Sequence, residues 1–103
     1  MGWHELAAEA DLAPGERRTY RSPIGDVTVF NHKGELFALE DACPHQGASL
    51  GEGVFHDGRV ICPWHSWVFD VKSGECPRGT HEPARPVALR VRDGRIEIEV
   101  DDA

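Results

Sequence analysis

The sequence lacks the features of a membrane or secreted protein. No apolar run approaches the roughly 20 residues that a membrane-spanning helix needs, and Met1 to Glu5 show neither the basic nor the apolar region of a signal peptide. Position 6 is Leu6, where N-myristoylation requires Ser or Thr. We therefore expect a cytoplasmic protein that does not associate with membranes.

Positive charge is scarce. Eleven Lys and Arg residues stand against 18 Asp and Glu residues, which gives a formal net charge of −7 over 103 residues. This balance argues against nucleic acid as a partner and is suited to docking against a basic patch on another protein. The length predicts a single domain over residues 1–103 with one modest core.

Catalytic signatures are also missing. The sequence contains no Ser/His/Asp set, no Gly-rich phosphate loop and no nucleotide fingerprint, so we expect no catalytic residues. Three cysteines cannot all pair within one chain, and in a reducing compartment such cysteines bind metal more often than they form disulfides. Cys76 lies outside the motif described next, and we interpret it as an ordinary loop or half-buried cysteine.

Two short Cys/His pairs dominate the middle of the chain. Cys43-Pro44-His45 is separated by sixteen residues from Cys62-Pro63-Trp64-His65. One thiolate and one imidazole from each of two facing loops meet the needs of a [2Fe–2S] centre in which two His replace two Cys on one iron. Two Cys and two His also suit tetrahedral zinc. Zinc fingers, however, usually group like ligands together, so the cluster is favoured and zinc stays an alternative.

Strand-like patterns and turn signals surround these pairs. The dipeptides Lys33-Gly34, Asp57-Gly58 and Asp93-Gly94 predict hairpin turns, and a helical turn is expected before Pro14-Gly15. Residues 76–86 are rich in proline and glycine, so a loop is expected there. The predicted strands cover residues 3–7, 17–21, 27–31, 36–39, 54–56, 59–61, 67–71, 87–92 and 96–100. The fold class is therefore all-β, with short antiparallel strands.

On these motifs the chain resembles the Rieske [2Fe–2S] family. The resemblance implies an antiparallel β sandwich or partial barrel, the base, formed by about residues 1–40 and 72–103, with an inserted cluster-binding loop subdomain at about 41–71. It implies one cluster, with Cys43 and Cys62 on one iron and His45 and His65 on the other. Further motif positions that match are Gly47, Leu50, Trp67, Phe69, Asp70 and Gly74, and residues 83–86 would form a shielding loop.

Departures from the high-potential members are equally informative. Those members carry an extra cysteine in each ligand loop, where this chain has Ala48 and Trp64, and a Ser and a Tyr after the second His, where it has Trp67 and Phe69. Without hydroxyl donors to the sulfurs, the reduced cluster is less stabilised. The reduction potential should lie at the low end of the Rieske range, roughly −150 to 0 mV. Because reduction adds negative charge, it should also strengthen proton binding by the ligand histidines.

The remaining histidines and tryptophans have less specific interpretations. His4, His32, His56 and His81 fit no ligand spacing and are expected at the surface or in turns. Trp64 and Trp67 flank His65, where they could exclude water or simply pack the cluster subdomain.

We derive one leading hypothesis for the function and two alternatives. The first is a ferredoxin that carries one electron from a flavin- and NAD(P)H-dependent reductase to a terminal, ring-hydroxylating oxygenase. The second is the small subunit of an assimilatory NAD(P)H nitrite reductase, with the large subunit as acceptor. The third is a zinc-stabilised interaction module without a redox role, and a regulatory or sensing role is also conceivable.

Overall fold

A computed structural model describes residues 2–43, 48–63, 67–76 and 82–100 of the chain. These residues form ten strands and two short 3-10 helices. In chain order they are β1 (Gly2–Ala8), η1 (Glu9–Asp11), β2 (Arg17–Ser22), β3 (Gly25–His32), β4 (Glu35–Glu40), η2 (Leu50–Glu52), β5 (Val54–His56), β6 (Arg59–Ile61), β7 (Val68–Asp70), β8 (Pro86–Val87), β9 (Leu89–Arg92) and β10 (Arg95–Val100).

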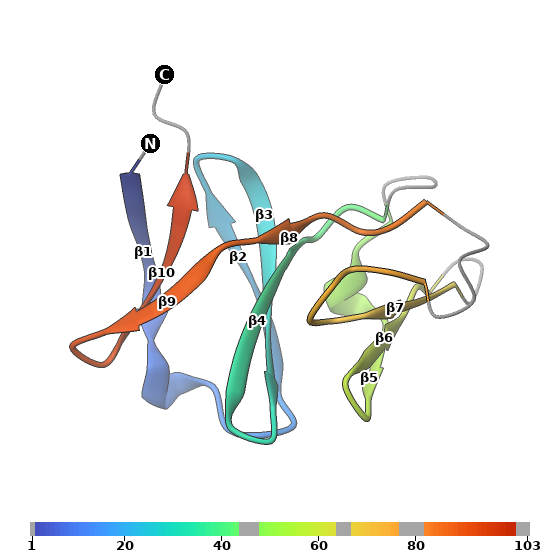
Figure 1. Ribbon diagram of the computed structural model, residues 1–103, viewed down its shortest axis with the longest axis horizontal. Helices are drawn as coiled ribbons and strands as arrows, with labels where there is room; N and C mark the ends of the chain where they lie inside the picture. Colours follow the sequence, from blue (N-terminus) through green and yellow to red (C-terminus); the bar gives the residue numbers. More distant parts are fainter. Residues whose placement is uncertain (1, 44–47, 64–66, 77–81, 101–103) are drawn as a thin grey trace.

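The strands form three antiparallel sheets, which confirms the predicted all-β class. One sheet has the order β1-β10-β9, the next β2-β3-β4-β8, and a small third sheet β5-β6-β7. Figure 1 shows the first two sheets side by side, with the third at the far end of the molecule. In the described part of the chain, no helix is long and apolar enough to cross a membrane. The boundaries of the inserted subdomain, near residues 41 and 71, stay a prediction.

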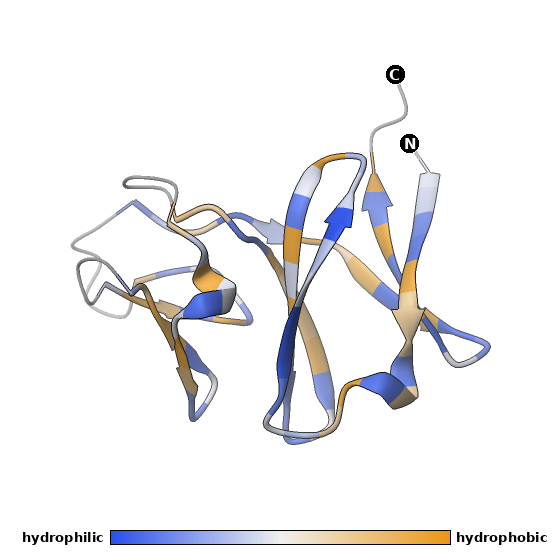
Figure 2. Cartoon of the chain, turned by 180° about the vertical axis from the view of Figure 1, so that it is seen from behind, coloured by the Kyte–Doolittle hydropathy of each residue, from blue (hydrophilic) through white to orange (hydrophobic). Residues whose placement is uncertain are grey.

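The middle sheet is buried on both faces, which explains why residues 27–31 are all buried. Val27 and Val29 of β3 pack on Ile96 and Ile98 of the first sheet in one hydrophobic cluster. Phe30, which follows Val29 and therefore points the other way, belongs to a second cluster shared with the third sheet. Figure 2 shows hydrophobic and hydrophilic residues alternating along several strands, with hydrophilic residues at the turn between β9 and β10.

The three predicted hairpin turns are all present. Lys33, Asp57 and Asp93 have φ between 51° and 54°, and the glycine after each also has positive φ. Two successive residues with positive φ match the right-handed twist of the strands that they join. The pairs β3–β4, β5–β6 and β9–β10 follow directly from these turns.

One strand prediction is wrong in a way that matters for the architecture. Residues 87–92 were expected as one strand, but the chain changes sheets at Ala88. β8 pairs with β4, through Val87 opposite Ala38, whereas β9 pairs with β10. The Ala88 carbonyl accepts a hydrogen bond from the Glu99 N–H at 2.9 Å. β8 and β9 each direct one face towards the hydrophobic core. Large apolar residues therefore recur at every second position from residue 87 to residue 91, and this alternation does not reveal the change of sheet.

A pair of aromatic rings joins the middle sheet to the third sheet and can be tested by mutation. Phe30 and Phe55 meet edge to face, with ring centroids 5.1 Å apart. We expect a double-mutant cycle of Phe30→Leu and Phe55→Leu, followed by chemical denaturation, to give a coupling of about 0.5–1.5 kcal/mol. Strictly additive effects would mean that this contact does not stabilise the packing of the two sheets.

Candidate metal centre

Each predicted ligand loop is closed by a backbone hydrogen bond of the same type, from a cysteine N–H to the carbonyl of the residue five positions later. The Cys43 N–H donates to the Ala48 carbonyl, and the Cys62 N–H donates to the Trp67 carbonyl, both at 2.8 Å. Each bond spans five residues and begins at a cysteine followed by proline. Since β5 and β6 lie between the two loops, the Asp57-Gly58 hairpin links their stems directly.

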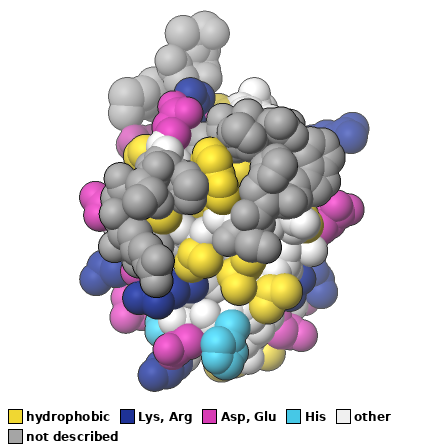
Figure 3. Space-filling model, turned by 90° about the vertical axis from the view of Figure 1, so that its right-hand side faces the viewer, with side chains coloured by type: hydrophobic (Ala, Val, Ile, Leu, Met, Phe, Trp, Pro, Cys, Tyr) yellow, Lys and Arg dark blue, Asp and Glu magenta, His cyan; other side chains and the backbone are white. Residues whose placement is uncertain are grey.

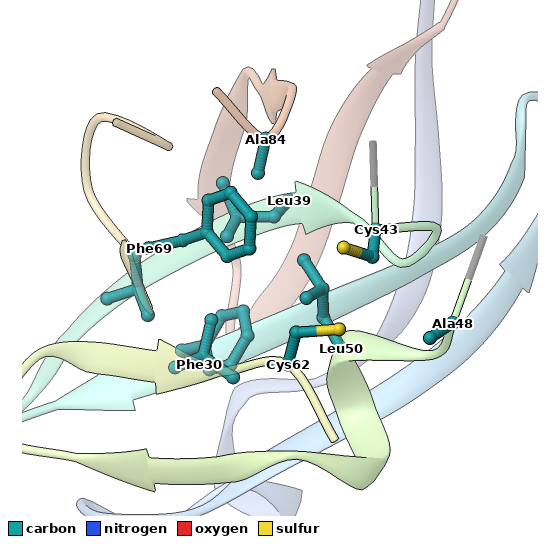
Figure 4. Packing of buried hydrophobic residues seen from close by; sticks show 10 residues of the cluster. Phe30, Leu39, Cys43, Ala48, Leu50, Cys62, Phe69 and Ala84 are labelled. Atoms are coloured by element: carbon teal, nitrogen blue, oxygen red, sulfur yellow. The ribbon is translucent and has the colours of Figure 1, made fainter. Parts of the chain in front are cut away.

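Both cysteines are buried at these stems. Cys43 is 3% exposed and Cys62 is 2% exposed, and both belong to the hydrophobic cluster that contains Phe30, Leu50 and Phe69. Figure 4 shows the two side chains on either side of Leu50, with both sulfur atoms on the same side of the phenylalanine rings. Two sulfur ligands from two separate loops, held away from water, fit one side of a [2Fe–2S] centre.

The predicted histidine ligands cannot be placed in the same way. His45 and His65 lie in segments 44–47 and 64–66, which are outside the described residues, together with Gly47, Trp64 and His81. Their role as ligands stays a prediction. Within the described ranges, no group of three or more His, Cys, Asp or Glu residues could hold a metal.

The segment expected to shield the cluster lies against the cysteines. Ala84 is buried in their hydrophobic cluster, and its N–H donates to the Gly74 carbonyl at 2.8 Å. Gly74 has φ of +77°, and a Cβ there would collide with the Ala84 carbonyl oxygen, so only glycine fits. Pro86 belongs to β8, so the predicted loop 76–86 ends one residue earlier, because proline is tolerated on this edge strand.

Asp41 is a buried residue at this site that the sequence did not single out. It is 7% exposed and stands two positions before Cys43. Its Oδ1 accepts hydrogen bonds from the Thr28 hydroxyl at 2.6 Å, the Gly51 N–H at 2.8 Å and the Ser49 hydroxyl at 3.1 Å. One carboxylate oxygen therefore joins the middle sheet to the chain that returns from the first ligand loop.

Arg17 of β2 forms a second clamp on the same segment. Its Nε donates to the Gly51 carbonyl at 3.1 Å and its Nη2 to the Gly53 carbonyl at 2.5 Å. A Cβ at Gly51 would collide with Thr19 Oγ1, and one at Gly53 would collide with the Ile61 carbonyl oxygen. Close backbone approach at both glycines thus lets η2 lie against the middle sheet and β6.

The other described residues that the sequence brought to attention differ in their burial. Trp67 is partly buried against the cysteine cluster, which supports the packing interpretation. His56 is exposed on β5, and His32, His4 and Cys76 are half-buried. His32 and His56 line an open groove of about 600 Å³ on the side of the molecule.

Comparison with known proteins identifies the family. A family model described as the Rieske [2Fe-2S] domain matches residues 2–92. The chain is 36% identical over 100 residues to the anthranilate 1,2-dioxygenase ferredoxin subunit of Burkholderia cepacia, covering 95% of this chain and 92% of that protein. A 65-residue match, 42% identical, covers 63% of this chain but only 11% of apoptosis-inducing factor 3 of Mus musculus.

A solved structure extends the likeness to three dimensions. It is described as a complex of reduced oxygenase and oxidized ferredoxin in carbazole 1,9a-dioxygenase, and one of its chains aligns with a TM-score of 0.85 at 28% identity. The alignment covers 93% of this chain and 91% of the other. The architecture predicted from the sequence is therefore confirmed over nearly the whole chain.

The Arg17 clamp predicts a specific loss of stability. We expect Arg17→Met to lower the free energy of unfolding by about 1.5–3 kcal/mol, because two carbonyls lose a charged donor. Arg17 and Arg21 are both exposed arginines of β2, and Arg17 is the one that bonds to the Gly51 and Gly53 carbonyls. The matched control is therefore Arg21→Met, which should change the free energy of unfolding by less than about 0.5 kcal/mol. Urea denaturation of the three proteins measures the difference, and equal effects of the two substitutions would refute a clamp.

Proposed function

The chain belongs to the Rieske [2Fe–2S] domain family, and on this basis we propose that it is a one-electron carrier, the ferredoxin component of an oxygenase system. The observation that supports this most directly is the pair of buried cysteines at the stems of two hairpin-linked loops. Membership of the family implies a Rieske-type [2Fe–2S] cluster. The match to a dioxygenase ferredoxin subunit over 92% of its length favours this hypothesis over a nitrite reductase subunit or a zinc module.

The proposed ligands are the four predicted from the sequence. Cys43 and Cys62 would hold one iron, and His45 and His65 the other. When bound, a Rieske cluster supplies one-electron redox chemistry without a vacant coordination position for a substrate. The chain's own contribution is to hold the ligands, exclude water around the sulfurs and present the histidine side to a partner.

The surroundings of the cysteines favour a low reduction potential. Phe69 is fully buried in their cluster and Trp67 packs against it, and neither side chain carries a hydroxyl that could donate to a sulfur. Fewer donors mean less stabilisation of added negative charge. We expect a midpoint of roughly −150 to 0 mV, the lower part of the Rieske range.

We propose a terminal oxygenase as the acceptor and a flavin- and NAD(P)H-dependent reductase as the donor. Figure 3 shows the end of the molecule that carries the third sheet, where described hydrophobic side chains gather near the centre and charged ones lie mainly around the outline. A net charge of −7 suits attraction to basic partners. We also infer a cytoplasmic location, because thiolate ligands are kept available in a reducing compartment.

The test of the proposed function is electron paramagnetic resonance of the dithionite-reduced protein, with iron, sulfide and zinc assayed on the same sample. We expect two irons and two sulfides per chain and a Rieske-type signal, with an average g below that of an all-cysteine cluster. A silent sample that contains stoichiometric zinc and no sulfide, from cells able to build clusters, would support the zinc module instead.

The histidine assignment makes its own prediction. We expect His45→Ala and His65→Ala each to abolish the Rieske signal, because one iron then lacks a protein ligand. His56→Ala, at an exposed histidine of β5, is the matched control and should keep both the signal and the iron content. An unchanged spectrum in either ligand variant would exclude that histidine as a ligand.

Docking through opposite charges predicts a dependence on salt. We expect the second-order rate of electron transfer to a terminal oxygenase to fall by about tenfold or more between low and high ionic strength, since screening removes steering. Stopped-flow measurements over a NaCl series test this, with sucrose solutions of matched viscosity as the control. A rate that is independent of salt would contradict electrostatic docking.

A further inference from the structure

The backbone of Asp41 is fixed independently of its side chain. Its N–H donates to the Asp26 carbonyl at 2.9 Å, and its carbonyl accepts from the Leu50 N–H at 2.8 Å. Asp41 therefore stays beside the start of β3 whatever its carboxylate does. The backbone bond to Leu50 already ties Asp41 to the segment opposite, and the side chain adds bonds to Ser49 and Gly51, the residues on either side of Leu50.

In the hydrogen-bond network around the Asp41 carboxylate, the carboxylate oxygen is always the acceptor. Thr28 uses its single hydroxyl proton on Asp41 Oδ1 at 2.6 Å, so Thr19 is the donor in the 2.9 Å contact between the two threonines. The Thr19 hydroxyl also lies 3.5 Å from Asp41 Oδ1, as a longer and weaker donor. Ser49 and the Gly51 N–H also donate to the same oxygen. Hydroxyls and an amide are neutral donors, so they solvate the negative charge without cancelling it.

This charge lies close to a proposed ligand. Two residues of extended chain span at most about 7 Å, which limits the distance between the α-carbons of Asp41 and Cys43. Asp41 is 7% exposed, so little water screens it. A buried negative charge near a redox centre opposes the addition of an electron to that centre.

We propose that Asp41 is a positioning residue of the metal centre with two linked effects. It fixes the chain that returns from the first ligand loop, through Ser49 and Gly51, and its charge lowers the affinity of the centre for an electron. This inference rests on the proposed function, in which Cys43 is a ligand, and assigns a role to a residue outside the ligand motif. The network reaches back to β2 and β3, so the middle sheet itself supports the loop.

The sharpest test is Asp41→Asn, because asparagine keeps an Oδ1 acceptor of nearly the same shape and removes the charge. We expect iron and sulfide content to be retained and the equilibrium constant for reduction to rise by about tenfold, which is 59 mV for a one-electron couple. A redox titration followed by electron paramagnetic resonance measures it. An unchanged potential would overturn the proposed effect of the charge.

The positioning effect is tested by removing a donor to Asp41 on the segment that returns from the first ligand loop. Ser49→Ala removes one donor and leaves the charge in place, so we expect the cluster to be lost several times faster on incubation with a chelator. Ser22→Ala is the matched control, because its hydroxyl donates at 2.6 Å to the Gly25 carbonyl in a turn of the middle sheet, outside the ligand loops. Equal rates of loss from the two variants would overturn the positioning effect.

A third variant decides the matter if Asp41→Asn does not fold. Thr28→Val keeps the charge and removes its closest donor, so the equilibrium constant for reduction should fall severalfold, opposite in sign to the asparagine variant. A potential equal to that of the unmodified protein would then overturn the proposal. Absence of a Rieske signal from the unmodified protein would instead contradict the proposed function itself, so the two failures are distinguishable.

Discussion

Burial of two cysteine sulfurs against the middle sheet is the constraint on which the rest of the structure depends. Cys43 and Cys62 come from different loops, yet both pack in the cluster that includes Phe30 and Leu39. β3 and β4 are covered on both faces, by the first sheet on one side and by the third sheet on the other. Both cysteines lie in the cluster between the middle sheet and the third sheet. The burial of these strands on both faces gives the cysteines a water-poor setting, and the hydrophobic shell around a metal centre controls solvent access to it.

Polar side chains determine the exact position of the segment after the first ligand loop, which apolar packing alone does not. Hydrophobic contact is non-directional, so it brings the third sheet to the middle sheet without fixing its exact placement. Arg17 and Asp41 supply directional bonds to the return chain after the first loop, at two carbonyls, one hydroxyl and one amide. Glycines at 51 and 53 remove the side chains that would keep the two layers apart. The proposed electron carrier thus depends on a few bonds outside its ligand motif.

Local signals made much of this architecture predictable. Positive φ at Asp57 and Asp93 follows from the turn dipeptides, and the Cys/His spacing by itself pointed to the cysteine pair. The sheet change at Ala88 was not predictable, because both short strands share one alternation. Nor was Arg17, whose partners lie 34 and 36 residues away in the sequence, with no local pattern to reveal them. The assignment of His45 and His65 stays a prediction.

The hairpin between the two cysteines has a consequence for the spacing of the two loops. The chain between Cys43 and Cys62 doubles back at Asp57-Gly58, where both residues have positive φ. A two-residue turn of this type fixes which residues of β5 and β6 stand opposite one another. The relative position of the two loop stems is therefore determined in part by the length of one turn that contains no ligand.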